Sequence, residues 1–269
     1  MGHHISTEAA SAQVEVFDTA EALAHQVAGK LLDVLRETIA AEGIAHVSLT
    51  GGGAGIKTLR AAAELLRQGG TATPDFSAVH FWWGDERLLP ADDPERNETQ
   101  AHEALLDQLI ADYGLPRENI HPMPCSEEAA NPEAGAQMYA QQLAEFAPQG
   151  GVKGMIMPPL AVMLLGVGPD GHINSLFPGK DALRVSGQAT TGEDDAPAQL
   201  GPPMRVTMTF DAIHSARRVW MGVAGQDKAP AAAQALAADA DVAQVPAADA
   251  RGAEETIWHM DRAAAAELS

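Results

Sequence analysis

Two side chains in the stretch LLGVGPDGHINSLFPG, residues 164–179, are suited to acid–base chemistry. His172 belongs to the residue type that exchanges protons near neutral pH, so it can take a proton from water and return it during a reaction. Asp170 precedes it by two residues in a glycine-rich turn, where a carboxylate can bond to the ring and fix its tautomer. The pair therefore predicts a general base with an orienting carboxylate.

The same stretch fits the spacing G-x-G-x-x-G, which begins here at Gly166 and ends at Gly171. A dinucleotide-binding turn with this spacing needs a helix that opens at the third glycine, followed by a second strand and an acidic residue about 20 positions later. Pro178 would stop any helix within two turns, and the segment after it is polar and loop-like. We therefore interpret the glycines as shaping a turn that presents Asp170 and His172.

A second group of reactive side chains lies at the end of VHFWWGDE, a predicted strand over residues 79–86. Alternation along a strand sends Asp85 and Arg87 to one side, where an arginine can grip a phosphate through two hydrogen bonds. Glu86 points to the other side, where we expect a solvated acidic turn. Asn97 is expected to N-cap the next helix, although a ligand role is also open.

A third group is the glycine run at residues 51–55, which follows the predicted strand HVSLT. Between a strand and a helix, such a run lets the backbone N–H groups of Gly52 and Gly53 approach an anion beside the hydroxyl of Thr50. The run does not satisfy the P-loop pattern, because the second glycine is out of register. A tight turn without a ligand is the alternative interpretation.

Positive charge is scarce in this chain, which has 17 Lys and Arg against 37 Asp and Glu and a net charge of -20. Such a surface repels nucleic acid and anionic membranes, so we expect neither as a partner. An anionic substrate would need local cations. Arg205 opens a predicted strand and Lys228 opens a predicted helix, and together with Arg87 they would form a phosphate clamp, although each alone could be a surface cation.

Several other kinds of site have no support in the sequence. No H-E-x-x-H or Cys/His spacing indicates a metal, no G-x-S-x-G elbow indicates a serine hydrolase, and we expect no cofactor. Cys125 is the single cysteine, which excludes an intrachain disulfide and suits a reducing cytoplasm. Residues 1–12 lack the apolar core of a secretory signal, and no stretch approaches the ~20 apolar residues of a membrane span.

Predicted strands and helices alternate along the chain. This pattern indicates a Rossmann-like three-layer α/β/α fold with a mainly parallel open sheet, formed by one catalytic domain over residues 1–269. We expect residues 1–12 to be flexible and 187–204 to be a surface loop. The strands are predicted at 46–50, 79–86, 160–166, 205–210, 217–225 and 256–260, and the helices at 19–42, 56–67, 97–112, 132–146 and 226–238. All three reactive groups follow strands, and the carboxyl ends of parallel strands are where such sheets bind ligands.

Taken together, the motifs resemble a known family. SLTGGGAG, WWGDERLLPADDPERN, LLGVGPDGHINSLFPG, RVTMTFDAI and GVAGQDK resemble the 6-phosphogluconolactonases in order and spacing, from about Leu49 to Lys228. The resemblance implies a fold shared with glucosamine-6-phosphate deaminases. It also implies hydrolysis of 6-phospho-D-glucono-1,5-lactone to 6-phosphogluconate, with His172 and Asp170 catalytic and Asp85 beside them. A phosphorylated sugar lactone would then be the ligand, and no cofactor is needed.

Two departures from the family pattern bear on this expectation. Many relatives have a hydroxyl residue and a proline where this chain has residues 53–56, so contacts there would fall on backbone N–H groups and Thr50. The sister deaminases have a glutamate where this chain has Phe177. A deaminase with this sequence would thus lack one of the acidic residues of the deaminase pattern. A deaminase-like sugar-phosphate isomerase and a non-catalytic sugar-phosphate sensor are the alternatives.

Overall fold

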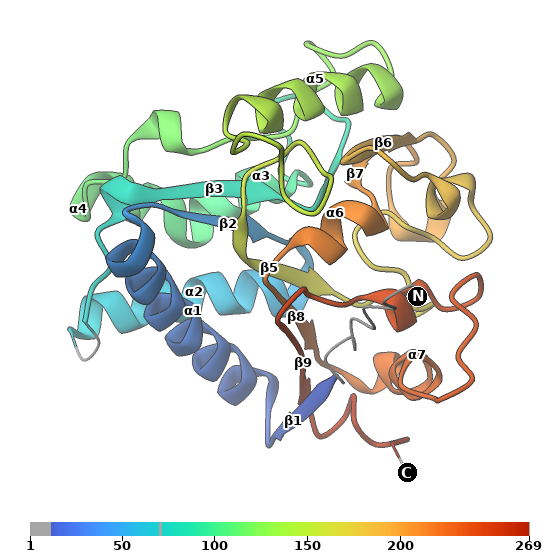
Figure 1. Cartoon of the computed structure of the whole chain (residues 1–269). Coiled ribbons are helices and arrows are strands. Elements are labelled where there is room, and N and C mark those ends of the chain that lie inside the picture. The colour runs from blue at the N-terminus through green and yellow to red at the C-terminus, as the bar shows by residue number, and fades with distance from the viewer. Residues whose placement is uncertain (1–11, 70–71, 269) are drawn as a thin grey trace, which may run out of the picture.

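The computed structural model describes residues 12–69 and 72–268. Its main sheet has six parallel strands flanked by helices, which confirms the predicted α/β class (Figure 1). Across the sheet the strands are β1 (Gln13–Phe17), β9 (Glu255–Asp261), β8 (Arg218–Val223), β5 (Leu160–Gly166), β2 (Ala45–Leu49) and β3 (Val79–Trp83). Residues 1–12 were expected to be flexible; all of them except Ala12 lie outside the described ranges.

The strand β5 lies inside the sheet between β8 and β2. Its sequence LAVMLLG is apolar throughout, and every residue before the final glycine is buried. A strand covered on both faces has no polar side to show, which is why the pattern is continuous rather than alternating. The strands β2 and β3 extend the sheet on one side of β5, whereas β8 and β9 extend it on the other. The strand order therefore reverses beside β5.

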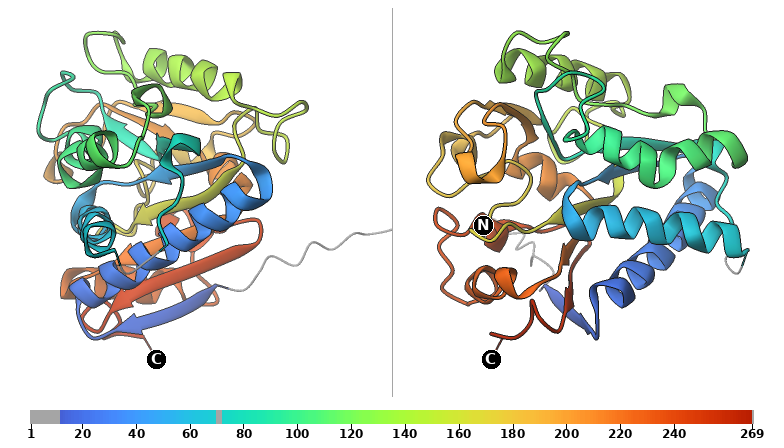
Figure 2. Two further views of the ribbon diagram at one scale, coloured as in Figure 1. Left: turned by 90° about the vertical axis from the view of Figure 1, so that its left-hand side faces the viewer. Right: turned by 180° about the vertical axis from the view of Figure 1, so that it is seen from behind.

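Two long helices, α1 (Ala20–Glu42) and α2 (Gly52–Gln68), pack against each other and against the sheet, as the two views in Figure 2 show. The hydroxyl of Thr19 caps α1 by accepting from the backbone N–H of Ala22, and Gly43 ends the helix in the left-handed conformation. The shorter helices are α3 (Asn97–Ala101), α4 (Asp107–Asp112), α5 (Pro132–Glu145), α6 (Phe210–Ser215) and α7 (Ala229–Ala235). A π-helical segment joins α3 to α4.

The predicted strand over residues 79–86 divides at Gly84, which corrects the sequence interpretation. β3 stays in the main sheet, whereas β4 (Asp85–Arg87) pairs antiparallel with β7 (Arg205–Met208) in a separate three-stranded sheet. A Cβ on Gly84 would lie 2.4 Å from the Oδ1 of Asn174, so no side chain fits where the chain changes sheets. The strand predicted over 205–210 stops at Met208, because the hydroxyl of Thr209 caps α6.

The segment 187–204 was expected to be a surface loop, but it contains β6 (Thr190–Glu193), the third strand of the small sheet. Thr190, Thr191 and Glu193 are buried there. Pairing with β7 satisfies their backbone groups, the Thr190 hydroxyl donates to the carbonyl of Ala136 in α5, and the Glu193 carboxylate accepts from the backbone N–H of Asp195. Within the described ranges, no helix has both the length and the apolarity needed to cross a membrane.

Three histidines cluster at the edge strand β3: His46 and His121 are buried, and His80, within β3, is half-buried. The Nδ1 of His80 and the Nε2 of His121 are 2.9 Å apart. The ring of Trp82 stacks on His121, and the Nε1 of Trp82 donates to the Nδ1 of His46. Burial, together with the charges of neighbouring histidines, lowers the pKa of His46 to about 3 and that of His121 to about 4. The folded protein therefore keeps these rings neutral in mild acid.

Lowering the pH from 6.5 towards 4 is expected to destabilise the fold. Unfolded histidines bind protons near pH 6.5 and these folded ones do not, so stability is complete above pH 6.5 and falls below it by up to about 1.4 kcal/mol per histidine per pH unit. Urea midpoints measured from pH 7.5 to pH 5 check this. The variant His121→Gln, which cannot titrate, should show a shallower pH dependence; an unchanged slope would contradict the explanation.

Candidate active site

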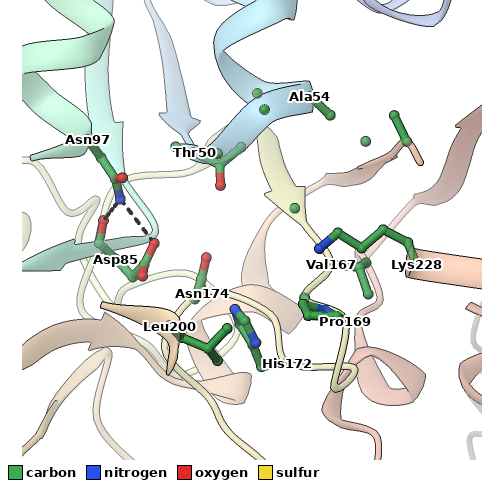
Figure 3. A pocket seen from close by; sticks show the side chains of 18 of the residues that line it. Thr50, Ala54, Asp85, Asn97, Val167, Pro169, His172, Asn174, Leu200 and Lys228 are labelled. Carbon is green, nitrogen blue, oxygen red and sulfur yellow. Dashed lines mark hydrogen bonds between the residues drawn. The ribbon is translucent and has the colours of Figure 1, made fainter. Parts of the chain in front are cut away.

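A pocket of about 390 Å³ lies at the carboxyl ends of β2, β5 and β8, where the strand order reverses (Figure 3). This is the position at which open parallel sheets bind ligands. The small sheet forms the opposite wall through β4 and β7. The predicted site residues that line the pocket are Thr50, Gly52, Gly53, Asp85, Arg87, His172, Arg205 and Lys228, and Asn97 and Phe177, which the sequence also singles out, line it too. Asp170 does not line it and bonds to His172 from behind.

The turn after β5 holds the acid–base pair in place. Within it, the backbone N–H of Gly168 donates to the carbonyl of His172, and Gly171 adopts a φ of 81° that glycine tolerates best. A Cβ on Gly168 would lie 2.0 Å from the Nδ1 of His172, so only glycine leaves room for the imidazole. The next helical turn is Asp181–Arg184, so no helix opens at Gly171. The turn thus lacks the helix that a dinucleotide site requires.

His172 and Asp170 form a short side-chain contact, 2.5 Å between Nδ1 and Oδ1. Burial acts to raise the pKa of Asp170, but the hydrogen bond and charge of His172 outweigh it and the pKa is lowered. Because Asp170 stays ionised and occupies Nδ1, Nε2 is the nitrogen left for chemistry in the pocket. The ring of Phe177 lies 4.7 Å from the imidazole, centroid to centroid, and fixes its plane from one side.

Asp85 is held on the opposite side of the pocket by two donors. Its Oδ2 accepts from the hydroxyl of Ser175 at 2.7 Å, and its Oδ1 accepts from the Nδ2 of Asn97 at 3.3 Å. Asn97 also donates to the Asp85 backbone carbonyl at 2.8 Å. Asn97 is therefore not the N-cap predicted from the sequence. It is the first residue of α3, and its side chain positions Asp85.

Glu86 was expected in a solvated turn, but it is 1% exposed. Its carboxylate accepts three backbone N–H groups, those of Arg87, Asn97 and Glu98, at 2.8–2.9 Å, and so performs the capping role that Asn97 lacks. Burial raises the pKa of Glu86 to about 7, against the opposing charge of Arg96 and these hydrogen bonds. The carboxylate ties the pocket strand β4 to the start of α3.

Replacing Glu86 with glutamine is expected to lower the free energy of unfolding by about 1–3 kcal/mol. The new NH₂ group would face backbone donors, and at least one buried N–H would lose its acceptor. Urea denaturation at pH 8 measures the effect. Glu118→Gln, at an exposed carboxylate, serves as the control and should leave stability unchanged. Equal midpoints for the two variants would show that the carboxylate does not hold α3.

Arg87 and Arg205 lie directly opposite each other on the β4–β7 ladder. Arg205 is 3% exposed and donates to the carbonyls of Pro202 and Leu200 at 2.7 Å, while Arg87 donates to the carbonyl of Glu95. Burial lowers the pKa of Arg205; the charge of Asp85 opposes this and that of Arg87 adds to it. Like charges directly opposite on a ladder are unfavourable, and a bound anion would relieve them.

The glycine run lies across the pocket from these arginines. The helix α2 begins at Gly52, four residues earlier than predicted, with Gly51 as its N-cap and no capping side chain. Its first N–H groups and the positive end of its dipole therefore face the pocket. Lys228 extends its amine into the same space and pairs with Asp227 at 3.0 Å (Figure 3). Lys57 is turned away and pairs with Glu21.

The structure also adds residues that the sequence analysis did not assign. Asn174 and Leu200 line the pocket, and Ser175 supports Asp85 from beneath. A short polar residue inside a motif gives no sequence signal that distinguishes a pocket wall from a turn. In the described part of the chain, no three His, Cys, Asp or Glu side chains are grouped so as to hold a metal ion.

Comparison with known proteins places the chain in a family. Residues 18–258 match the family described as glucosamine-6-phosphate isomerases/6-phosphogluconolactonase. The chain is 41% identical to the 6-phosphogluconolactonase of Mycobacterium leprae over 96% of its length and 99% of the relative. It is 25% identical, with a TM-score of 0.78, to the 6-phosphogluconolactonase structure from Trypanosoma brucei, covering 96% and 99% of the two chains.

The fold alone does not separate the two activities of the family. A monomeric glucosamine-6-phosphate deaminase superposes with a TM-score of 0.75 over 95% of this chain and 99% of its own, at 21% identity. At that identity the likeness concerns the fold only. By the match over residues 18–258 and the 41% identity, the chain belongs to the glucosamine-6-phosphate isomerase/6-phosphogluconolactonase family.

Proposed function

We propose that the protein hydrolyses 6-phospho-D-glucono-1,5-lactone to 6-phosphogluconate in the oxidative pentose phosphate pathway. One observation carries the proposal: His172, paired with Asp170 behind it, lines the same pocket as Arg87, Arg205 and Lys228. The pair suits proton transfer to and from water, and the cations suit a phosphorylated ligand in a chain whose net charge is otherwise -20. Membership of the family supports the same reaction.

In the proposed mechanism, the Nε2 of His172 takes a proton from a water molecule as that water attacks the lactone carbonyl. The tetrahedral intermediate then collapses, and His172 returns the proton to the departing ring oxygen. Asp170 stays ionised, holds Nδ1 and stabilises the imidazolium that forms between the two steps. Asp85, fixed by Ser175 and Asn97, binds a sugar hydroxyl or orients the water.

The negative charges of the substrate meet the positive side of the pocket. Arg87, Arg205 and Lys228, with the backbone N–H groups of Gly52 and Gly53, hold the phosphate and the oxyanion in this proposal. Thr50 lines the pocket beside them and can add a hydroxyl donor. The steps use only these groups and water, so the proposal includes no cofactor.

Phe177 argues against the deaminase alternative. It is 2% exposed and packs on His172, at the position where the deaminase pattern has a glutamate. A buried aromatic ring offers no proton at that position. A non-catalytic sensor would bind 6-phosphogluconate without turnover, and the pairing of His172 with Asp170 favours an enzyme over it.

A coupled assay tests the proposal. Fresh lactone is generated by oxidation of glucose 6-phosphate, and 6-phosphogluconate is followed as it forms. We expect formation well above the spontaneous rate and no ammonia from glucosamine 6-phosphate. Ammonia release without lactone turnover would favour the deaminase, and binding of 6-phosphogluconate without either reaction would favour the sensor.

A further inference from the structure

The side chain of Asn174 lies between the two catalytic groups of the proposed reaction. Asn174 follows His172 by two residues and lines the same pocket. Figure 3 shows its amide pointing into the space between Asp85 and His172, on the side towards Thr50. No other side chain explains this orientation, because neither Oδ1 nor Nδ2 of Asn174 has a hydrogen-bond partner among the described residues.

Holding the amide there is unfavourable for the fold. Asn174 is 8% exposed, so two polar atoms are removed from water without compensation. Its φ of 49° lies in the left-handed region, which asparagine tolerates better than most non-glycine residues, so the uncompensated burial of the amide is the main cost. Gly84 is also required beside it, since a Cβ there would lie 2.4 Å from Oδ1. Unfavourable features of this kind persist mainly at functional sites.

The chemistry of the amide points to its ligand. A carboxamide offers a donor and an acceptor side by side, and a hydroxyl group is the substrate group that can satisfy both. A phosphate offers only acceptors at its ionised oxygens, and the cations and N–H groups of the pocket already serve it. Because Asn174 lies beside His172, the hydroxyl it meets belongs to the carbonyl end of the substrate ring.

On the basis of the proposed function, we propose that Asn174 is a specificity-determining residue that binds a ring hydroxyl, at C2 or C3, of the phosphorylated lactone. Asp85 lies beside Asn174 (Figure 3), since the neighbouring Ser175 bonds to the Asp85 carboxylate, and would meet the same part of the ring. A substrate that lacks the hydroxyl would leave the buried amide unpaired, and sites of this kind discriminate against such analogues.

The test combines deletion of the side chain with deletion of the substrate hydroxyl. Asn174→Gly removes the amide and tolerates the positive φ, and its kcat/KM is compared with that of the wild type on the parent, 2-deoxy and 3-deoxy lactones. We expect the variant to lose about 10-fold on the parent lactone. On one of the two deoxy lactones, the kcat/KM of the wild type should be about 10-fold lower than on the parent lactone. The kcat/KM of the variant should be the same on that deoxy lactone as on the parent.

Lys153→Gly is the matched control, because Lys153 is the other described non-glycine residue with a positive φ and is exposed. It should leave all three rates unchanged. Equal losses by Asn174→Gly on all three lactones, or no loss on any, would overturn the assignment. If the wild type turns over no lactone, the proposed function fails separately. Calorimetric titration with 6-phosphogluconate and its 2-deoxy and 3-deoxy analogues then decides the role of Asn174 by the same comparison.

Discussion

Replacing His172 with alanine is expected to lower kcat/KM for 6-phosphogluconolactone by about 10²–10⁴-fold, the usual contribution of a positioned general base. The lactone also hydrolyses unaided, so the variant should approach the rate in buffer alone. Binding of 6-phosphogluconate should change only a few-fold, because the cations that hold the phosphate stay in place. The measurement is lactone turnover together with calorimetric titration of the product.

Two further variants define the role of the pair. Asp170→Asn keeps the size of the side chain but removes the charge that meets the Nδ1 of His172, so we expect a smaller loss of kcat than for His172→Ala. His25→Ala, at an exposed histidine of α1, is the control for general effects and should leave turnover unchanged. Full activity of His172→Ala would refute the mechanism even if the protein is a lactonase.

Replacing Arg87 with glutamine is expected to raise KM for the phosphorylated lactone by about 10–100-fold, the effect of losing a charged hydrogen bond to phosphate. Unphosphorylated glucono-1,5-lactone has no group for this contact, so its slow turnover should not change. Arg87 is the better choice than Arg205, because Arg205 also holds the loop carbonyls of Pro202 and Leu200. Steady-state kinetics on the two substrates make the comparison.

The control for charge is Arg184→Gln, since the Arg184 side chain is 70% exposed and lies outside the pocket. It should leave both KM values unchanged, which separates a local contact from the change in net charge. If Arg87→Gln impaired both substrates equally, Arg87 would act on the fold of the wall or on the reacting carbonyl rather than on the phosphate.

The parts of the fold that the sequence predicts are those with long, regular patterns. The side chains of β5 are apolar throughout, and α1 has an apolar side chain every four residues. Each pattern depends on which faces of the element are buried and not on which particular segment covers them, so it can be recognised in the sequence. Alternation along β4 also correctly separates Asp85 and Arg87, which line the pocket, from Glu86. These patterns suffice to bring the three reactive groups to one edge of the sheet.

The residues whose surroundings the sequence predicts wrongly are those that depend on contacts between distant segments. Glu86 is buried because the start of α3 supplies three N–H donors, and nothing within its own strand indicates that. Strand β6 is short and polar, and only its pairing with β7 and the cover of α5 bury it. Asn174 is a turn residue by sequence, whereas its unpaired amide becomes visible only when β4 and the turn after β5 are placed side by side.

The most direct test of the central claim is the decay of purified 6-phospho-D-glucono-1,5-lactone followed by ³¹P NMR, with wild-type protein, with His172→Ala and in buffer alone. The account predicts rapid conversion to 6-phosphogluconate by the wild type and near-buffer decay with the variant. Decay with the wild type that is no faster than in buffer would contradict the proposed activity.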